Sequence, residues 1–383
     1  MKETSIDKLH IFITIFIVSL IMSVQGPIFT PYAAMLGASS VMIGIMLSAS
    51  QVTDLTGNLM VGPLVDRFGK RLFITIPLFI SAFLYMAHGF IFSSTTLLIL
   101  RSLNSFVLAF LMPTTFALIS GYAKNARQQG KNMAIIGILG MFANIFAPLI
   151  GGKLGATIGY ANTYIIIGLA LLVIAVYAFI FLRERQYIAV NKNSTSVHLL
   201  TVFKNPQLLL VYLTGFAIMY IHGVIIYEVP YLTVEKGLST ASTGKLFSIM
   251  GIGSLVTLSF FFLQRLDAIK RMMFGLFTLC ISLAVLINGV LSLTVFLFIM
   301  GICFGLVMPA AATAVTSAVQ SNEHGRAFGV MSAIYSLGMI ASSFLTSIIR
   351  QIISPYFIAF LVGMLMLIII GLIKFHTPKT VRT

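Results

Sequence analysis

Three ionisable residues, Asp54, Arg101 and Glu228, lie inside otherwise apolar stretches of the sequence. A carboxylate whose surroundings alternate between dry and polar can take up and release a proton, because burial favours the neutral acid and a nearby cation favours the ion. Gln51 and Asn58 recur with Asp54 at helical spacing and form a polar stripe, which must face protein or water. We interpret Asp54 as a protonation site; the alternative is a structural acid held by hydrogen bonds.

Glu228 stands two residues before Pro230, towards the end of its apolar stretch. It could bind a cation, take up a proton or pair with Arg101, and the alternative is an acid at the membrane surface. His222 could titrate near neutral pH, although a single membrane histidine more often joins helices through a hydrogen bond. An unpaired arginine inside a span costs at least about 2.5 kcal/mol on insertion scales. We therefore expect Arg101 either to face protein or to extend to the headgroups.

Membrane-spanning helices are the elements that must hold these residues. Of the 383 residues, 59% are hydrophobic and 9% are charged, whereas ordinary soluble domains carry about 25% charged residues. A helix that crosses a bilayer needs about 20 mostly apolar residues, and the apolar runs predict twelve such helices. We therefore predict an all-α integral membrane protein with twelve transmembrane helices and no room for a soluble catalytic domain.

Residue patterns that carry enzyme chemistry are missing from the sequence. It has no nucleotide-binding loop, no cluster with metal-ligand spacing and no nucleophile triad. Its two cysteines, Cys280 and Cys303, both lie inside apolar segments, where a small hydrophobic residue is the usual interpretation. We therefore expect no enzyme activity, no cofactor and no metal site.

The formal net charge is +15, from 24 Lys and Arg against nine Asp and Glu. In a soluble protein such a charge would suggest nucleic acid as a partner. Here the basic residues lie in short gaps between apolar runs, so the lipid bilayer is the expected partner and nucleic acid is not. Cytoplasmic loops carry the excess of Lys and Arg, which predicts a multi-pass protein of the cell (plasma or inner) membrane with both termini in the cytoplasm.

The sequence also contains an internal repeat. Turn and packing residues recur in the same order about 200 residues apart. The matched positions are Pro31 and Pro230, Tyr32 and Tyr231, Gly37 and Gly237, Ser39 and Ser239, Gly44 and Gly244, Asp66 and Asp267, and Pro113 and Pro309. We predict two pseudo-symmetric six-helix bundles, residues 1–182 and 207–383, joined by a cytoplasmic linker at 183–206. Such a fold is self-sufficient as a monomer.

One short motif follows the second apolar run. It consists of Gly62, Leu64, Asp66, Arg67, Gly69, Lys70 and Arg71. It resembles the loop signature between the second and third helices of the major facilitator superfamily, and every defined position matches. The resemblance implies the major facilitator fold and a conformational latch in which Asp66 meets the start of the eleventh span, at Ser321 to Arg326. The alternative interpretation is a positively charged topology anchor.

Two weaker matches accompany this motif. Arg101 with Asn104 resembles the family's Arg-x-x-Gln-Gly motif, with Asn104 in place of Gln, which implies that Arg101 helps to govern proton exchange. A further stretch is similar to the antiporter signature of the drug/proton efflux branch, with alanines replacing two glycines. Its residues are Ala147, Pro148, Gly151 and Gly152. Small residues at this spacing also occur in ordinary helix packing.

The resemblance implies a secondary active transporter that moves a small-molecule substrate by alternating access. We expect a proton-coupled antiporter that exports small amphipathic or cationic compounds, as in multidrug-type efflux. The alternative within transport is a carrier of an anionic or zwitterionic metabolite, metallophore or lipid, with Arg101 as its counter-ion. From a different class, a membrane receptor that transports nothing is the remaining alternative, and a measurement of substrate flux would distinguish it from a transporter.

Overall fold

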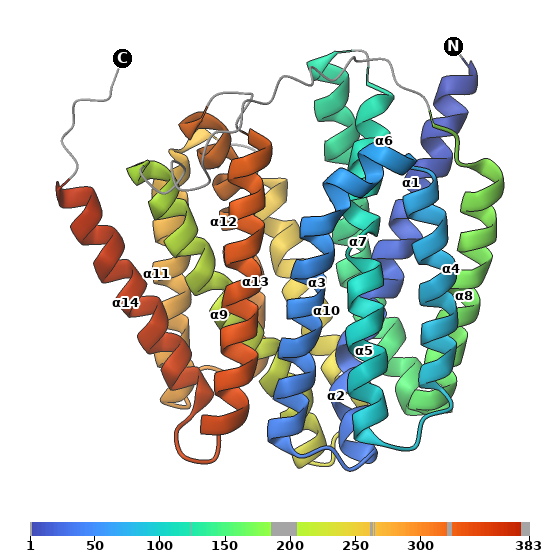
Figure 1. Cartoon of the computed structure of the whole chain (residues 1–383). Helices are drawn as coiled ribbons and strands as arrows, with labels where there is room; N and C mark the ends of the chain where they lie inside the picture. The colour runs from blue at the N-terminus through green and yellow to red at the C-terminus, as the bar shows by residue number, and fades with distance from the viewer. Residues whose placement is uncertain are drawn as a thin grey trace. The chain divides into compact units, whose positions relative to one another are not determined.

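The computed structural model describes residues 2–123, 125–184, 205–260, 263, 265–319 and 324–376. Within these residues every regular element is a helix (Figure 1). The helices are α1 (Lys2–Val24), α2 (Gly26–Met35), α3 (Ser40–Phe68), α4 (Leu72–His88), α5 (Ser94–Leu108), α6 (Leu111–Gly121), α7 (Ala126–Ile158), α8 (Tyr160–Phe181), α9 (Pro206–Glu235), α10 (Thr240–Ser259), α11 (Ala268–Ile287), α12 (Leu293–Ala318), α13 (His324–Ile349) and α14 (Pro355–His376).

These helices form the twelve predicted spans, because the first and fourth spans each consist of two helical segments. Among the described residues, ten stretches are long and apolar enough to cross a membrane. They include residues 5–35, which join α1 to α2, and 94–121, which join α5 to α6. Pro27 follows the break at Gln25, and Pro113 follows the break before Leu111. A proline lacks the amide hydrogen and clashes with the carbonyl four residues earlier, so each break has a local cause.

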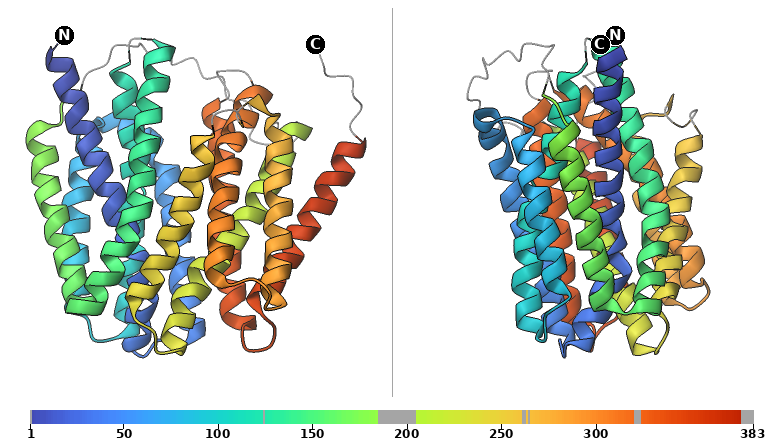
Figure 2. Two further views of the ribbon diagram at one scale, coloured as in Figure 1. Left: turned by 180° about the vertical axis from the view of Figure 1, so that it is seen from behind. Right: turned by 90° about the vertical axis from the view of Figure 1, so that its right-hand side faces the viewer.

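The described residues group into two compact units. The first comprises residues 2–184 and 229–248, and the second comprises 205–228 and 249–376. In the first unit, α4 packs on α8, α1 on α7 and α3 on α5 (Figures 1 and 2). Close backbone approach explains the α3 and α5 pair, because a Cβ on Gly57 would lie 2.7 Å from the carbonyl oxygen of Phe106.

The second unit repeats these pairings. α11 packs on α14, as α4 packs on α8. α9 packs on α13 where a Cβ on Gly338 would lie 2.8 Å from the Phe216 carbonyl oxygen, and α10 meets α12 at Gly253 and Gly301. Each of these three helix pairs of the first unit therefore has its counterpart in the second, which confirms the pseudo-symmetric fold predicted from the repeated sequence.

The two ends of the first unit differ in charge. We call one of them the basic end, and its basic side chains are Arg67, Lys70, Arg71, Arg127, Lys131 and Arg183. The other end, called the opposite end below, carries the turns at Gly37 and Gly159, which both adopt positive φ. Helices α1, α3, α5 with α6, and α7 run between these two ends (Figure 1).

Candidate functional site

Asp54 is the middle residue of α3, which runs from Ser40 to Phe68. The side-chain amide of Asn58 donates a hydrogen bond of 3.0 Å to its carboxylate, as expected for polar residues four positions apart on one helix face. Asp54, Asn58 and Gln51 are all half-buried. Among the described residues Asp54 has no ion pair, so its carboxylate is held by a neutral amide alone.

Arg101 points into the first unit. Its guanidinium donates a hydrogen bond to Gln25 Oε1 at the break between α1 and α2, and lies 4.6 Å from the ring centroid of Phe29. Asp54 lies within electrostatic reach of this charge without touching it. Asn104, one helical turn further along α5, is 1% exposed. Neutral partners within the first unit therefore hold Arg101.

Glu228 pairs with Arg350 rather than with Arg101, the partner considered from the sequence. Its carboxylate oxygen lies 3.1 Å from Arg350 Nε, where α13 ends. Glu228 is 3% exposed, which also excludes an acid standing clear of the protein in this structure. Arg350 lies 122 positions away in the chain, so no local pattern pointed to it.

His222 lies on α9, six residues before Glu228. Its ring packs against Phe304 of α12, with 4.9 Å between the ring centroids. No hydrogen bond joins it to the residues that the structure describes, so the helix-joining hydrogen bond considered from the sequence is not made. His222 therefore contributes a packed ring to the interior of the second unit.

The predicted latch motif is partly visible. Gly69 ends α3 with φ 91°, a conformation that favours glycine, and a Cβ there would lie 3.1 Å from Glu184 Oε2. Arg67 is exposed and lies over the ring of Phe68. Gly62, the side chain of Asp66 and the segment from Ser321 to Arg326 lie outside the described residues or side chains.

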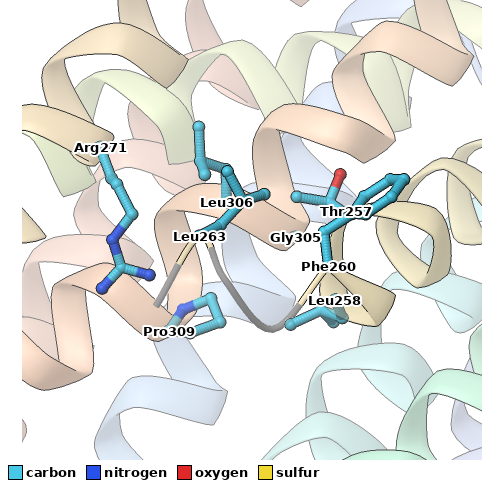
Figure 3. Close-up of a pocket in the computed structure, with 8 residues that line it drawn as sticks. All are labelled: Thr257, Leu258, Phe260, Leu263, Arg271, Gly305, Leu306 and Pro309. Carbon is cyan, nitrogen blue, oxygen red and sulfur yellow. The ribbon is translucent and has the colours of Figure 1, made fainter. Parts of the chain in front are cut away.

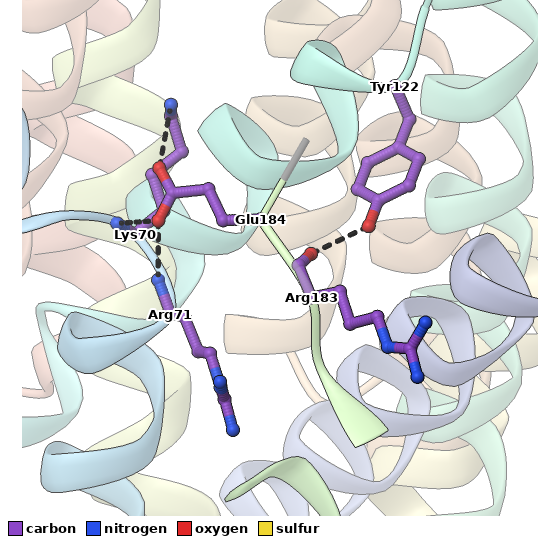
Figure 4. Close-up of polar contacts among 5 residues, drawn as sticks. All are labelled: Lys70, Arg71, Tyr122, Arg183 and Glu184. Carbon is purple, nitrogen blue, oxygen red and sulfur yellow. Dashed lines mark hydrogen bonds and ion pairs between the residues drawn. The ribbon is translucent and has the colours of Figure 1, made fainter. Parts of the chain in front are cut away.

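Glu184 holds the loop between α3 and α4 (Figure 4). Its carboxylate accepts hydrogen bonds from the backbone amides of Lys70, at 2.9 Å, and Arg71, at 3.4 Å, and it pairs with Lys70 Nζ at 3.3 Å. Arg71 in turn donates to the carbonyl oxygen of Phe179. A carboxylate at the start of α4 is favourable because free amides and the helix dipole meet there.

Small residues bring α7 against two neighbours. A Cβ on Gly151 would collide with the Val24 carbonyl oxygen of α1, and one on Gly152 would lie 2.6 Å from the Thr240 carbonyl oxygen and 3.1 Å from Gly244 Cα of α10. Ala147 is fully buried, and α7 stays helical through Pro148. Together Ala147, Pro148, Gly151 and Gly152 allow backbone-to-backbone contact near the opposite end of the first unit.

Recesses occur in both units of the described structure. In the second unit, a cavity of about 10 Å³ holds about one water and lies beside Arg271, which is 5% exposed (Figure 3). In the first unit, an open groove of about 460 Å³ lies at the opposite end between Met35, Tyr160 and Leu238. Neither recess contains Asp54, Arg101 or Glu228.

Sequence reasoning missed several residues that contact the predicted ones, and four of them bind a predicted charged residue or its loop. They are Gln25, Phe29, Glu184 and Arg350. Gln25 carried a usable signal, because it is a polar residue within the first apolar run. Glu184 lies at the start of the predicted linker, 183–206.

Comparison with known proteins adds independent information. The family model described as Major Facilitator Superfamily matches residues 11–287 and 261–383. The multidrug resistance protein MdtG of Rahnella sp. is 23% identical over 303 residues, which cover 74% of this chain and 71% of that protein. The multi-drug resistance efflux pump PmrA homolog of Lactococcus lactis is 25% identical over 325 residues, covering 82% of this chain and 78% of that protein.

Solved structures share the fold. The nucleoside transporter NupG superposes with a TM-score of 0.80 at 13% identity, covering 96% of this chain and 99% of that one. A bacterial homolog of the human lysosomal transporter Spinster, in an inward-facing and unoccupied conformation, gives a TM-score of 0.76 at 16% identity, covering 97% of this chain and 96% of that one. At these identities the likeness concerns the fold and carries no substrate.

Proposed function

The chain belongs to the Major Facilitator Superfamily and is a multi-pass membrane transporter, and from this premise we propose that it is a proton-coupled antiporter. In this proposal it exports small amphipathic or cationic compounds by alternating access, with protons as the coupling ion. Two of its relatives carry the names of multidrug resistance or efflux proteins, which supports export.

The main support for this proposal is the surroundings of the Asp54 carboxylate. It lies in mid-helix, half-buried, and a neutral amide is its hydrogen-bond partner. A carboxylate in such surroundings changes its proton occupancy when hydration or a nearby charge changes, whereas an acid locked in an ion pair stays ionised. Arg101 supplies the nearby positive charge, and its neutral ligands leave that charge free to act on Asp54.

The remaining predicted residues take supporting roles. We assign Gln51, Asn58 and Asn104 to the polar surroundings of Asp54 and Arg101, and Glu228 with His222 to the cavity side of α9. The loop from Gly69 to Arg71 acts with Asp66 as the latch. In this proposal the protein is a monomer, residues 1–182 and 207–383 move as bundles about the linker 183–206, and the basic end faces the cytoplasm of a plasma or inner membrane.

A second candidate cargo follows from Arg101. Its guanidinium has no carboxylate partner among the described residues, and a buried cation held by neutral groups is suited to a carboxylate or phosphate. An anionic or zwitterionic metabolite, metallophore or lipid is therefore the alternative cargo.

The Asp54→Asn variant tests whether this residue couples proton movement to transport of the cargo. The variant is compared with native protein in proteoliposomes, using Glu235→Gln, an exposed acid at the end of α9, as the matched control. We expect Asp54→Asn to exchange labelled dye between the two sides at the native rate but to lose accumulation driven by a pH gradient. Native accumulation in Asp54→Asn would overturn the assignment of the proton to this residue.

A further inference from the structure

A cluster of buried polar side chains extends from Arg101 towards the opposite end of the first unit. Each of its members has one buried polar atom with no hydrogen-bond partner from the described protein. These atoms are Tyr85 Oη, His88 Nε2, Arg101 Nε, Asn104 Oδ1 and Tyr164 Oη. Tyr85, His88 and Tyr164 are fully buried. Leaving such atoms unsatisfied costs about 1–3 kcal/mol each, so five in one place require an explanation.

The side chains of the cluster are neighbours. The rings of His88 and Tyr164 are stacked with 4.9 Å between centroids, and Tyr85 lies 6.1 Å from Tyr164 on the inner side. The Tyr85 hydroxyl faces Asn104 and Gln25, and Gln25 accepts the hydrogen bond of Arg101. His88 ends α4, whereas Arg101 lies seven residues into α5, which is about 10 Å of helix. The cluster therefore extends from the opposite end inward.

The unpartnered atoms are chemically complementary. His88 Nδ1 lies 2.7 Å from the Leu84 carbonyl oxygen, which only accepts, so Nδ1 carries the hydrogen and Nε2 is an acceptor. Asn104 Oδ1 is also an acceptor, whereas the two tyrosine hydroxyls and Arg101 Nε donate. Buried water typically makes about three hydrogen bonds to such groups. Water between them would satisfy donors and acceptors together.

We propose that ordered water molecules bind among Tyr85, His88, Tyr164 and Arg101 and make this cluster a proton relay between the opposite end of the first unit and Asp54. This proposal rests on the proposed function, because Asp54 is the group that finally receives the proton. His88 is fully buried in this structure, so the relay takes up its proton in the conformation of alternating access that opens the opposite end to water. A hydronium O–H bond there breaks as His88 Nε2 gains the proton, and Nε2 then gives the proton to the water beside Tyr164 and Tyr85. Asp54 finally gains the O–H bond, while Arg101 keeps its proton and orients the water.

The groups that face His88 define its surroundings. Tyr164 of α8 stacks on it, and Tyr32 of α2 donates its hydroxyl hydrogen to the His88 carbonyl oxygen. Tyr85 lies on its own helix, and the charge of Arg101 on α5 acts on it electrostatically. All of these partners except Arg101 are neutral in the physiological range. None of these groups is a carboxylate, so in this proposal histidine, tyrosine and water carry the proton as far as Asp54.

Removing single hydroxyl groups tests the relay. Tyr85→Phe and Tyr164→Phe each delete one unpartnered oxygen and keep the ring, and Tyr220→Phe deletes an equally buried, unpartnered hydroxyl in the second unit as the control. A purely structural role predicts no loss, because removing an unsatisfied hydroxyl is neutral or stabilising. The relay predicts that dye accumulation driven by a pH gradient slows by about tenfold or more, while dye exchange without a gradient stays native.

The outcomes separate the relay from the proposed function. Native coupled rates in both variants would overturn the relay and leave proton-coupled export standing. Native protein that moves dye without protons would overturn the proposed function. The water itself is tested by a high-resolution experimental structure, in which the relay requires a water within hydrogen-bond distance of Tyr164 Oη or His88 Nε2. A dry cluster there contradicts the relay, whatever the transport assay shows.

Discussion

At the scale of single residues, the three ionisable residues Asp54, Arg101 and Glu228 have different surroundings. Asp54 is held by an amide, Arg101 by an amide and an aromatic ring, and Glu228 by an opposite charge. A buried ion pair fixes both partners in the charged state, whereas an acid held by neutral groups can change its proton occupancy. Glu228 is therefore expected to be structural first, and Asp54 to respond to protons.

Breaking the Glu228–Arg350 pair is expected to destabilise the second unit. Glu228→Gln or Arg350→Gln leaves one buried charge unpaired, which costs about 3 kcal/mol or more. The double variant should lose less than the sum of the two single losses, because neither charge then remains. Cys280 and Cys303 are buried free thiols in the same unit, so a thiol-reactive fluorophore reports the unfolding temperature. Strictly additive losses would show that the two side chains do not interact.

At the scale of helices, the positions of glycine determine where two helix backbones can come into contact. The contact between α7 and α10 depends on Gly152 and Gly244, where backbone meets backbone. Other glycines of α7 have open space around them, Gly140 among them. The same helix therefore contains both a contact that a side chain would block and a position where a side chain is free.

Gly152→Val is expected to reduce transport strongly, because its side chain would push α7 away from Thr240. Gly140→Val adds the same side chain to the same helix at a position with nothing within 4 Å of the new Cβ. Dye transport by both variants, normalised to folded protein, makes the comparison. The contact has no role in transport if the two variants lose activity equally.

At the scale of the whole molecule, the sequence repeat and the charge asymmetry concern two different properties, the symmetry of the fold and its orientation in the membrane. The repeat accounts for the matching helix pairs of the two units. The asymmetry concerns orientation, since basic residues gather at one end of the first unit and cytoplasmic loops carry the excess of Lys and Arg.

Orientation is tested with single cysteines. Gln129→Cys lies near the start of α7 at the basic end, and Thr95→Cys lies at the start of α5 at the opposite end; both native side chains are exposed. In intact cells an impermeant maleimide is expected to label Thr95→Cys, and to label Gln129→Cys only after permeabilisation. The reverse pattern would place the basic end outside.

Local sequence patterns account for much of this fold. Contacts between residues that are far apart in the chain could not be predicted from such patterns. The hydrogen bond between Asn58 and Asp54 follows from their spacing of four, and the broken spans follow from Pro27 and Pro113. The partner of Glu228 lies 122 residues away and depends on how α9 meets α13, which no periodicity specifies. The same applies to the cluster around Tyr164, whose members come from the three helices α4, α5 and α8.

Coupled exchange of protons for a lipophilic cation is tested most directly in proteoliposomes with an acidic lumen. A permanently charged lipophilic dye is added outside, and luminal pH and dye uptake are recorded together, with protein-free vesicles as the control. We predict that dye entry raises luminal pH in native protein and not in Asp54→Asn. Dye entry without a pH change, or movement of an organic anion in place of the dye, would contradict proton-coupled export of cations.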